Sequence, residues 1–391
     1  MKRLPLLPRI VIAIILGALI GQFMPDWGVR VFNTFNAIFD QLLRFIIPLI
    51  IIGLVTPAIA EVGKGAGKWL AITAGLAYVF TVASGLFSFA FTTALFPPIL
   101  QDVSIKALSE ASGEAFPAYF SIDIPPIMPV MTALITSFML GLGIAAFQAH
   151  ALNKGFSELR SIVHSTLEKV IIPFLPFYIF GLFNNMSATG EAAMVITAFL
   201  KIILLIFLFT ALLLLLQFAI AGIVARKSPF HALMRMMPAY FTALGTSSSA
   251  ATIPVTLRQT ISNGVREEVA GFVIPLCATI HLSGSTLKIV SCSLALMMIY
   301  GMPFDLPMYL GFIMMLGVTM IAAPGIPGGA IMAALGLLDS NLGFNAEMQA
   351  FMISLYVAMD SFGTACNVTG DGAIAMIVDR FYNKKKELKS T

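Results

Sequence analysis

Long, uninterrupted apolar stretches recur along this chain, and they restrict its fold more than any other feature. We count eight of them, at 8–24, 34–62, 69–99, 127–149, 165–188, 195–225, 268–299 and 346–380. About 20 apolar residues are enough for a helix to cross a bilayer. Only 11% of the 391 residues are charged, against roughly 25% in an average soluble chain. The sequence therefore predicts an all-α polytopic membrane protein with eight transmembrane helices.

The distribution of charge predicts the orientation of these helices. Cytoplasmic loops of membrane proteins carry an excess of lysine and arginine. On the side of the N-terminus, the loops hold Lys64, Lys68, Lys154, Arg160, Arg226, Lys227, Arg258 and Arg266. The outer segment 102–126 is instead mostly acidic. We therefore expect a multi-pass protein of the plasma (inner) membrane with both termini in the cytoplasm, and residues 383–391 as a cytoplasmic tail.

Two further apolar segments are interrupted in the middle. Segment 229–262 contains Thr246-Ser-Ser-Ser-Ala-Ala-Thr-Ile-Pro254, and segment 308–340 contains Ala322-Ala-Pro-Gly-Ile-Pro-Gly-Gly-Ala330. Broken backbone at membrane depth is tolerated only where it is buried in protein or lines a cavity. We interpret both segments as re-entrant helical hairpins, each followed by a long span. Two such units of opposite orientation form an inverted repeat, and transporters bind their substrates at the interface of such repeats.

The last span carries a stripe of polar residues. Asp360, Thr364, Asn367 and Asp371 are spaced by four, three and four residues, so they share one face of a helix. Such a stripe can join helices through hydrogen bonds. A carboxylate within a membrane span is costly, however, and usually functional. Four such residues beside two broken hairpins therefore predict a binding site for a polar solute and a cation.

Three motifs carry a resemblance to a known family. They are Thr-Ser-Ser-Ser-x-x-Thr-Ile-Pro at 246–254, Gly-Ile-Pro-Gly-Gly at 325–329 and Asn-Val-Thr-Gly-Asp at 367–371. In this order they resemble the dicarboxylate/amino acid:cation symporter family, which includes glutamate, neutral amino acid and serine/threonine transporters. The resemblance implies a homotrimer in which a mobile part moves as an elevator. Residues 1–228 would mostly supply the trimerisation scaffold, with spans 3 and 6 packing on the transport core formed by 229–382.

The resemblance also implies roles for individual residues. Asp360 matches the aspartate that holds a substrate α-amino group, and Asn367 matches the asparagine that holds the α-carboxylate. Broken-helix tips can supply further N–H and O–H donors to an anion. The remaining residues that we expect to bind substrate are Ser248, Ser249, Ser285, Gly325, Ile326, Pro327, Gly328 and Thr364.

The sequence departs from the acidic-substrate members of that family. Their arginine in the last span corresponds here to Gly363, and their first-hairpin arginine corresponds to Ser247. The nearest arginines that the sequence offers, Arg258, Arg266 and Arg380, lie at span ends. A side-chain carboxylate would thus lack a bidentate partner. We therefore expect a small neutral amino acid such as serine, threonine or alanine, with glutamate, aspartate and C4-dicarboxylates as poor substrates.

A second departure concerns the coupling ion. The seventh span of the family carries Asn-Met-Asp-Gly-Thr, which is replaced here by His281-Leu-Ser-Gly-Ser285. We expect one Na⁺ site, formed by Asp371 and by backbone carbonyls near Cys277, His281 and Asn367. Loss of the motif's aspartate indicates that a deeper Na⁺ site is absent.

Two basic side chains of the seventh span have two readings each. His281 and Lys288 lie two helical turns apart and could be purely structural. Alternatively, Lys288 replaces a missing Na⁺ as a tethered cation, or His281 titrates and brings in proton coupling.

The function predicted is that of a secondary active, Na⁺-coupled amino acid symporter with an elevator mechanism. A proton-coupled relative, an amino acid or dicarboxylate symporter of the same family, and an anion channel remain alternatives. We expect no enzyme activity, because Ser248 and Ser249 have only His281 as a conceivable base. No cofactor, no nucleic-acid partner and no metal beyond Na⁺ is expected, and the three cysteines form no CxxC pair. The expected partners are a small amino acid, the lipid bilayer and two further copies of the chain.

Overall fold

The computed structural model describes residues 6–63, 68–100, 116–190, 192–323 and 327–390. Within these ranges the secondary structure is helical and contains no strand, which confirms the predicted all-α class. Among the described residues, six helical segments are long and apolar enough to cross a membrane: Asp26–Ala60, Ala71–Leu95, Val130–Phe147, His150–Ala188, Ala192–Ala225 and Glu267–Ile299. The predicted first span, 8–24, is a helix of 16 residues (Leu6–Gly21). The predicted last span, 346–380, is divided into two helices.

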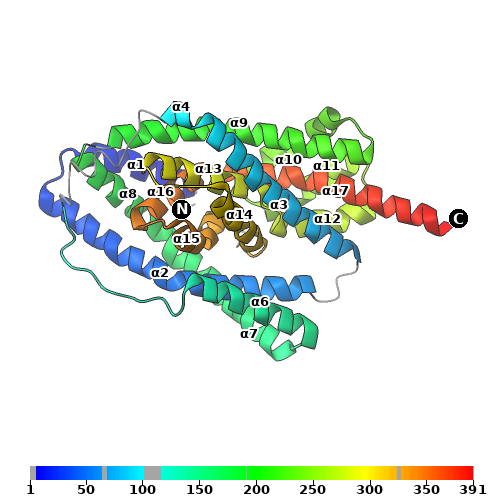
Figure 1. Cartoon of the computed structure of the whole chain (residues 1–391), viewed down its shortest axis with the longest axis horizontal. Coiled ribbons are helices and arrows are strands. Elements are labelled where there is room, and N and C mark those ends of the chain that lie inside the picture. Colours follow the sequence, from blue (N-terminus) through cyan, green and yellow to red (C-terminus); the bar gives the residue numbers. More distant parts are fainter. Residues whose placement is uncertain (1–5, 64–67, 101–115, 191, 324–326, 391) are drawn as a thin grey trace.

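The N-terminal half packs mainly as pairs of neighbouring helices. Helix α2 lies along α6, and α1 lies along α8. Gly21 lets α1 approach closely, because a Cβ added there would overlap the carbonyl oxygen of Asn184 on α8. In Figure 1, α2 and α9 run along opposite long edges of the molecule, with α13 to α16 between them. The helices of this half are α1 (Leu6–Gly21), α2 (Asp26–Gly63), α3 (Lys68–Leu95), α4 (Pro97–Leu100), α6 (Val130–Phe147), α7 (His150–Thr166), the π-helix η1 (Leu167–Ile171), α8 (Ile172–Ala188) and α9 (Ala192–Ala225).

Both interrupted segments form a helix, a break and a second helix, as the sequence predicts. The first consists of α10 (Pro229–Thr246) and α11 (Ser249–Ser262), which pack on each other. Ser247 turns the chain between them with a left-handed φ of 51°. The second consists of α14 (Leu306–Ile321) and α15 (Gly329–Leu342). Gly328 precedes α15 with a φ of 76°, a conformation that glycine adopts without steric cost.

Two breaks were not predicted. The expected spans 268–299 and 346–380 are each divided, into α12 (Glu267–Ile280) and α13 (Ser283–Ile299), and into α16 (Ala346–Ala358) and α17 (Asp360–Ser390). The polar stripe of the last span therefore begins at a helix N-terminus and not within a continuous helix. The breaks at His281–Leu282 and Met359 expose backbone groups beside this stripe.

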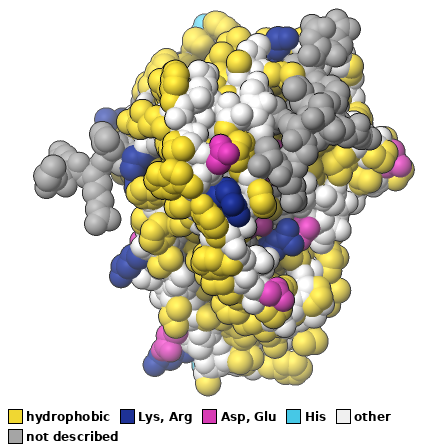
Figure 2. Space-filling model, turned by 90° about the vertical axis from the view of Figure 1, so that its left-hand side faces the viewer, with side chains coloured by type: hydrophobic (Ala, Val, Ile, Leu, Met, Phe, Trp, Pro, Cys, Tyr) yellow, Lys and Arg dark blue, Asp and Glu magenta, His cyan; other side chains and the backbone are white. Residues whose placement is uncertain are grey.

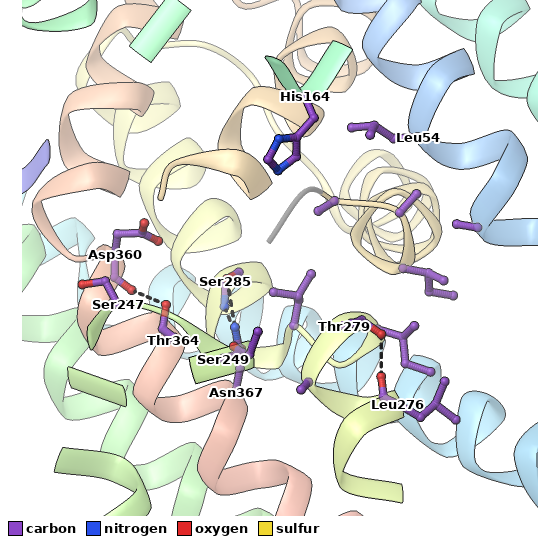
Figure 3. A pocket seen from close by; sticks show the side chains of 18 of the residues that line it. Leu54, His164, Ser247, Ser249, Leu276, Thr279, Ser285, Asp360, Thr364 and Asn367 are labelled. Carbon is purple, nitrogen blue, oxygen red and sulfur yellow. Dashed lines mark hydrogen bonds between the residues drawn. The ribbon is translucent and has the colours of Figure 1, made fainter. Parts of the chain in front are cut away.

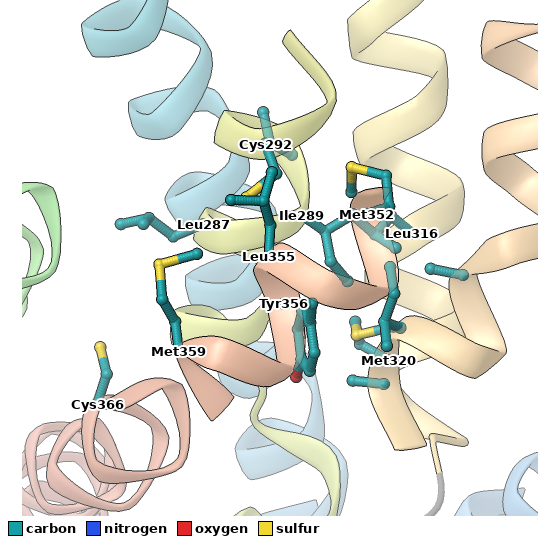
Figure 4. Packing of buried hydrophobic residues seen from close by; sticks show 14 of the residues in the cluster. Leu287, Ile289, Cys292, Leu316, Met320, Met352, Leu355, Tyr356, Met359 and Cys366 are labelled. Atoms are coloured by element: carbon teal, nitrogen blue, oxygen red, sulfur yellow. The ribbon is translucent and has the colours of Figure 1, made fainter. Parts of the chain in front are cut away.

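Helix α13 lies at the centre of the C-terminal half. All of its residues except Met298 are buried. Helix α3 packs along it and α9 packs on α17. Hydroxyl groups join α3 to α13: Ser84 Oγ donates to the Ser283 carbonyl at 2.9 Å, and Ser88 Oγ lies 2.7 Å from Ser291 Oγ. Figure 4 shows the apolar packing around this helix, where side chains of α13, α14 and α16 interdigitate.

The outer surface of the molecule is rich in large apolar side chains. Leu204 is 68% exposed and Ile223 is 76% exposed, both on α9. Figure 2 shows one end of the molecule, where hydrophobic side chains are broken by a few charged ones. Apolar surface of this extent marks contact with lipid or with other proteins, which agrees with a multi-pass membrane protein.

Candidate functional site

A cavity of about 470 Å³ opens where the two hairpins meet the breaks in α12–α13 and α16–α17. Asp360, Thr364 and Ser247 lie together on one side of it, and Ser285, Ser249 and Asn367 lie next to them (Figure 3). His164 on α7 and Leu54 on α2 form part of another wall. The cavity is thus shared between the C-terminal half and two helices of the N-terminal half.

Asp360 begins α17, and its carboxylate is held from two sides. The Gly328 N–H, at the tip of the second hairpin, donates to Asp360 Oδ2 at 2.8 Å. The Lys288 ammonium lies 3.6 Å from Asp360 Oδ1. The residue is 9% exposed and lines the cavity. The structure therefore places a largely buried anion at the junction of the second hairpin, α13 and α17.

Lys288 reaches this carboxylate from behind the cavity wall. It is 1% exposed and is not among the residues that line the cavity. Its Nζ donates to the carbonyl of Met359 at 3.1 Å and lies 3.8 Å from the centre of the Tyr356 ring. The Met359 carbonyl also accepts the Gly363 N–H at 3.1 Å, and the ring face attracts a cation. The ammonium thus has an ion pair, a hydrogen bond and a cation–π contact.

Asn367 closes the break between α12 and α13. Its Oδ1 accepts the Gly284 N–H at 2.8 Å and the Ser285 N–H at 3.4 Å, the first free amides of α13. Its Nδ2 donates to Ser285 Oγ at 3.2 Å, and the Tyr356 hydroxyl donates to the same oxygen at 2.9 Å. Asn367, Ser285 and Tyr356 all line the cavity. A fixed amide N–H₂ group therefore lies at the cavity edge, suited to a carboxylate.

The three serines of the first hairpin differ in their contacts and in whether they line the cavity. Ser248 Oγ accepts the Ala251 N–H at 3.3 Å and so caps α11, and Ser248 does not line the cavity. Ser249 and Ala250 do line it, and the first N–H groups of a helix have no partner within the helix. Ser247, which was not predicted as a site residue, lines the cavity and contacts Ser361 Oγ at 2.6 Å.

The second hairpin's predicted site residues are described only in part. Gly325 and Ile326 lie outside the described residues. Pro327 and Gly328 are described, and Gly328 contacts Asp360 as above. Thr364, one turn after Asp360, lines the cavity and donates to the Asp360 carbonyl at 3.1 Å.

Three of the four predicted cation residues, Cys277, His281 and Asp371, lie together in a second buried cluster, whereas Asn367 lines the cavity. His281 Nδ1 lies 2.8 Å from Asp371 Oδ1, and both side chains are buried. The Cys277 carbonyl accepts the His281 N–H at 2.9 Å. Gln217 on α9 donates through Nε2 to Ser283 Oγ at 3.1 Å. His281 Nε2 and Gln217 Oε1 are buried with no hydrogen-bond partner among the described residues.

Sequence reasoning missed part of the cavity wall. Arg160 and His164 on α7 line the cavity, although the sequence placed Arg160 in an inner loop and offered only Arg258, Arg266 and Arg380 near the site. That expectation was wrong because α7 begins at His150 and runs beside α2. Tyr356 was also missed. The only sequence feature that points to Tyr356 is its position about one helical turn before Asp360.

A comparison with known families gives one match that covers nearly the whole chain. The family described as the sodium:dicarboxylate symporter family matches residues 6–381. The matched range includes both hairpins, the buried ion pair and every predicted site residue. This confirms the resemblance drawn from the three motifs.

Proposed function

Since this chain belongs to the sodium:dicarboxylate symporter family, we propose that it carries a small neutral amino acid together with a monovalent cation. The family consists of secondary transporters, so the protein is a multi-pass membrane transporter and not an enzyme. Serine, threonine and alanine are the substrates that the site favours. Na⁺ is the coupling ion proposed first, and H⁺ is its competitor.

The observation that carries this proposal is the pairing of opposite chemistries around one cavity. Asp360 supplies a carboxylate for an ammonium group. Asn367 Nδ2 and the N-terminus of α11 supply hydrogen-bond donors for a carboxylate. A zwitterionic amino acid presents both groups on one carbon atom. The ammonium of the substrate would replace the Gly328 N–H at Asp360 Oδ2, which links substrate binding to the tip of the second hairpin.

The lack of a guanidinium group at position 363 supports a neutral side chain on the substrate. Gly363 has no side-chain donor, and its missing Cβ leaves the space that Lys288 Cε and Nζ fill. Lys288 is already paired with Asp360 and does not line the cavity. Thr364 and Ser247 offer hydroxyl groups on the same side, which suits a small polar side chain.

A second candidate follows from Arg160. Its presence in the cavity wall supplies a cation for a second carboxylate, as the family's description suggests. A dicarboxylate or acidic amino acid is therefore the competing substrate class. Neutral and acidic amino acids both carry an ammonium group that requires the negative charge of Asp360, whereas a C4-dicarboxylate does not.

We further propose the topology and assembly of the family for this chain. The two helix–break–helix segments would be re-entrant hairpins, the C-terminal half would move as an elevator against the scaffold, and the protein would form a homotrimer. The packing of α3 on α13 and of α9 on α17 supports the assignment of these two helices to the moving part.

Counterflow in proteoliposomes tests the proposed substrate class. Vesicles loaded with unlabelled serine, threonine, alanine, aspartate, glutamate or succinate are diluted into labelled substrate, with Na⁺, K⁺ or choline outside. We expect exchange of serine, threonine or alanine in Na⁺, and its loss in Asp360→Asn. Exchange of succinate or aspartate alone would refute the neutral amino acid proposal in favour of the Arg160 reading.

A further inference from the structure

The C-terminal half buries more negatively charged side chains than positively charged ones. Among the described residues, its buried acidic side chains are Asp360 and Asp371 and its buried lysine is Lys288. Asp371 lies beside His281, and Asp360 lies beside Lys288. With a neutral His281, these groups sum to one negative charge. Isolated charge within a bilayer is costly, so each buried carboxylate needs a positive partner.

The geometry around Lys288 shows a position built for a permanent cation. A Cβ at residue 363 would overlap the Lys288 Cε and Nζ atoms, so Gly363 leaves open the space that the end of this side chain occupies. The Met359 carbonyl and the Tyr356 ring provide two uncharged contacts for the ammonium. The side chain therefore has a defined place, although it contacts only one oxygen of Asp360.

The two oxygens of Asp360 face different partners. Oδ1 faces Lys288 behind the cavity, and Oδ2 faces the Gly328 N–H at the hairpin tip. A substrate ammonium can therefore take Oδ2 while Lys288 remains at Oδ1. Lys288 thus neutralises the carboxylate both with and without substrate.

We propose that Lys288 is a built-in counter-cation that replaces one coupling ion, so that a single monovalent cation, bound at Asp371, accompanies each substrate molecule. This inference rests on the proposed transport of a neutral amino acid. A zwitterion adds no net charge. One cation at Asp371 then brings the loaded C-terminal half to neutrality, whereas two would be needed if Lys288 were absent.

The test uses purified, reconstituted protein and the best substrate from the counterflow panel. For the wild type, we expect the ratio of labelled Na⁺ to substrate, or of H⁺ to substrate, to be about one, with a Hill coefficient of about one for the cation. In Lys288→Met, we expect the half-saturating cation concentration to rise about tenfold or more and the Hill coefficient to approach two. Lys288→Arg should keep the charge and stay closer to the wild type.

Lys201→Met is the matched control, because Lys201 on α9 donates to the Ile99 carbonyl, away from Asp360. It should leave the cation dependence unchanged. A purely structural role of Lys288 predicts lower yield or melting temperature with an unchanged Hill coefficient and cation ratio. That result, or a wild-type ratio of two or more, would overturn the inference.

If Lys288→Met does not fold, the double variant Lys288→Met/Asp360→Asn decides the question. Removing both charges should restore the melting temperature of the detergent-solubilised protein toward that of the wild type, although transport is lost. No recovery in the double variant would contradict the counter-cation role. Failure of the substrate proposal is seen separately, as an absence of neutral amino acid exchange in wild-type vesicles.

Discussion

At the scale of single residues, the site depends on which side chain occupies the space beside Gly363. Lys288 fills that space and contacts Asp360, where acidic-substrate relatives are expected to place an arginine. The sequence alone revealed the missing arginine and the unusual lysine. It did not reveal that the two positions share one volume, because they lie on α13 and α17 and meet only in the fold.

We expect a change of substrate specificity only when Gly363 and Lys288 are substituted together. Gly363→Arg alone should abolish uptake, because the new side chain overlaps Lys288 and places a second cation at Asp360. Gly363→Arg combined with Lys288→Ala restores a single cation and offers a bidentate partner to a carboxylate. We expect the double variant to take up aspartate better than either single variant.

Uptake of labelled aspartate and of labelled serine by these variants in proteoliposomes tests the prediction. Lys288→Ala alone serves as the control for the loss of lysine. Equal aspartate uptake by the double variant and by Lys288→Ala would show that residue 363 does not reach the substrate.

At the scale of elements, the four helix breaks around the site differ in how well the sequence predicts them. The two hairpin breaks contain proline, glycine or serine clusters and were predicted. The break residues themselves, His281, Leu282 and Met359, include no proline, glycine or serine, although polar residues follow each break directly. They are stabilised by contacts from distant elements, since Asn367 accepts the first amides of α13 and Lys288 donates to the Met359 carbonyl. Local sequence carries no record of such partners, so these breaks were read as continuous spans.

The tip of the second hairpin provides a prediction at this scale. Gly328 has a φ of 76° and donates its N–H to Asp360. A left-handed conformation costs a residue with a Cβ about 1–2 kcal/mol, so Gly328→Ala should weaken the contact with Asp360 that the substrate ammonium has to displace. We expect KM for substrate to fall by about 5- to 30-fold, measured by uptake in proteoliposomes.

Gly190→Ala is the matched control, because Gly190 also has a positive φ, of 88°, but a Cβ added there would meet no atom within 4 Å. Gly190 is not among the residues that line the cavity. It carries a similar backbone penalty without contacting the site. A rise of KM in Gly328→Ala, or the same change of KM in both variants, would contradict this prediction.

At the scale of the whole molecule, the cavity lies between the two halves of the chain. Arg160, His164 and Leu54 come from α7 and α2, whereas Asp360 and Asn367 come from α17. The C-terminal part of the site was largely predicted, because its motifs are contiguous in sequence. The opposite wall could not be predicted, because it depends on how α7 docks beside α2. An elevator requires this boundary to slide.

A disulfide between α15 and α2, across the boundary of the two halves, tests whether the halves move relative to each other. Gly336 on α15 packs against α2, and a Cβ built there lies 2.7 Å from Ile47 Cγ2, so side chains at these two positions would be in direct contact. We expect oxidised Gly336→Cys/Ile47→Cys to lose uptake and to regain it on reduction. Ser88→Cys/Ser291→Cys, which joins α3 to α13 within the proposed moving part, should remain active when oxidised. Full activity of the oxidised Gly336–Ile47 pair would exclude relative motion at this contact.

The burial of all three native cysteines has a practical consequence. Cys277, Cys292 and Cys366 are fully enclosed, so a maleimide dye added to the folded protein has no wild-type thiol within reach. A single cysteine introduced at an exposed site on α9 can therefore carry a fluorophore without first removing the native thiols. In the proposed homotrimer, its distance to a second dye in another subunit would report each step of the transport cycle in real time.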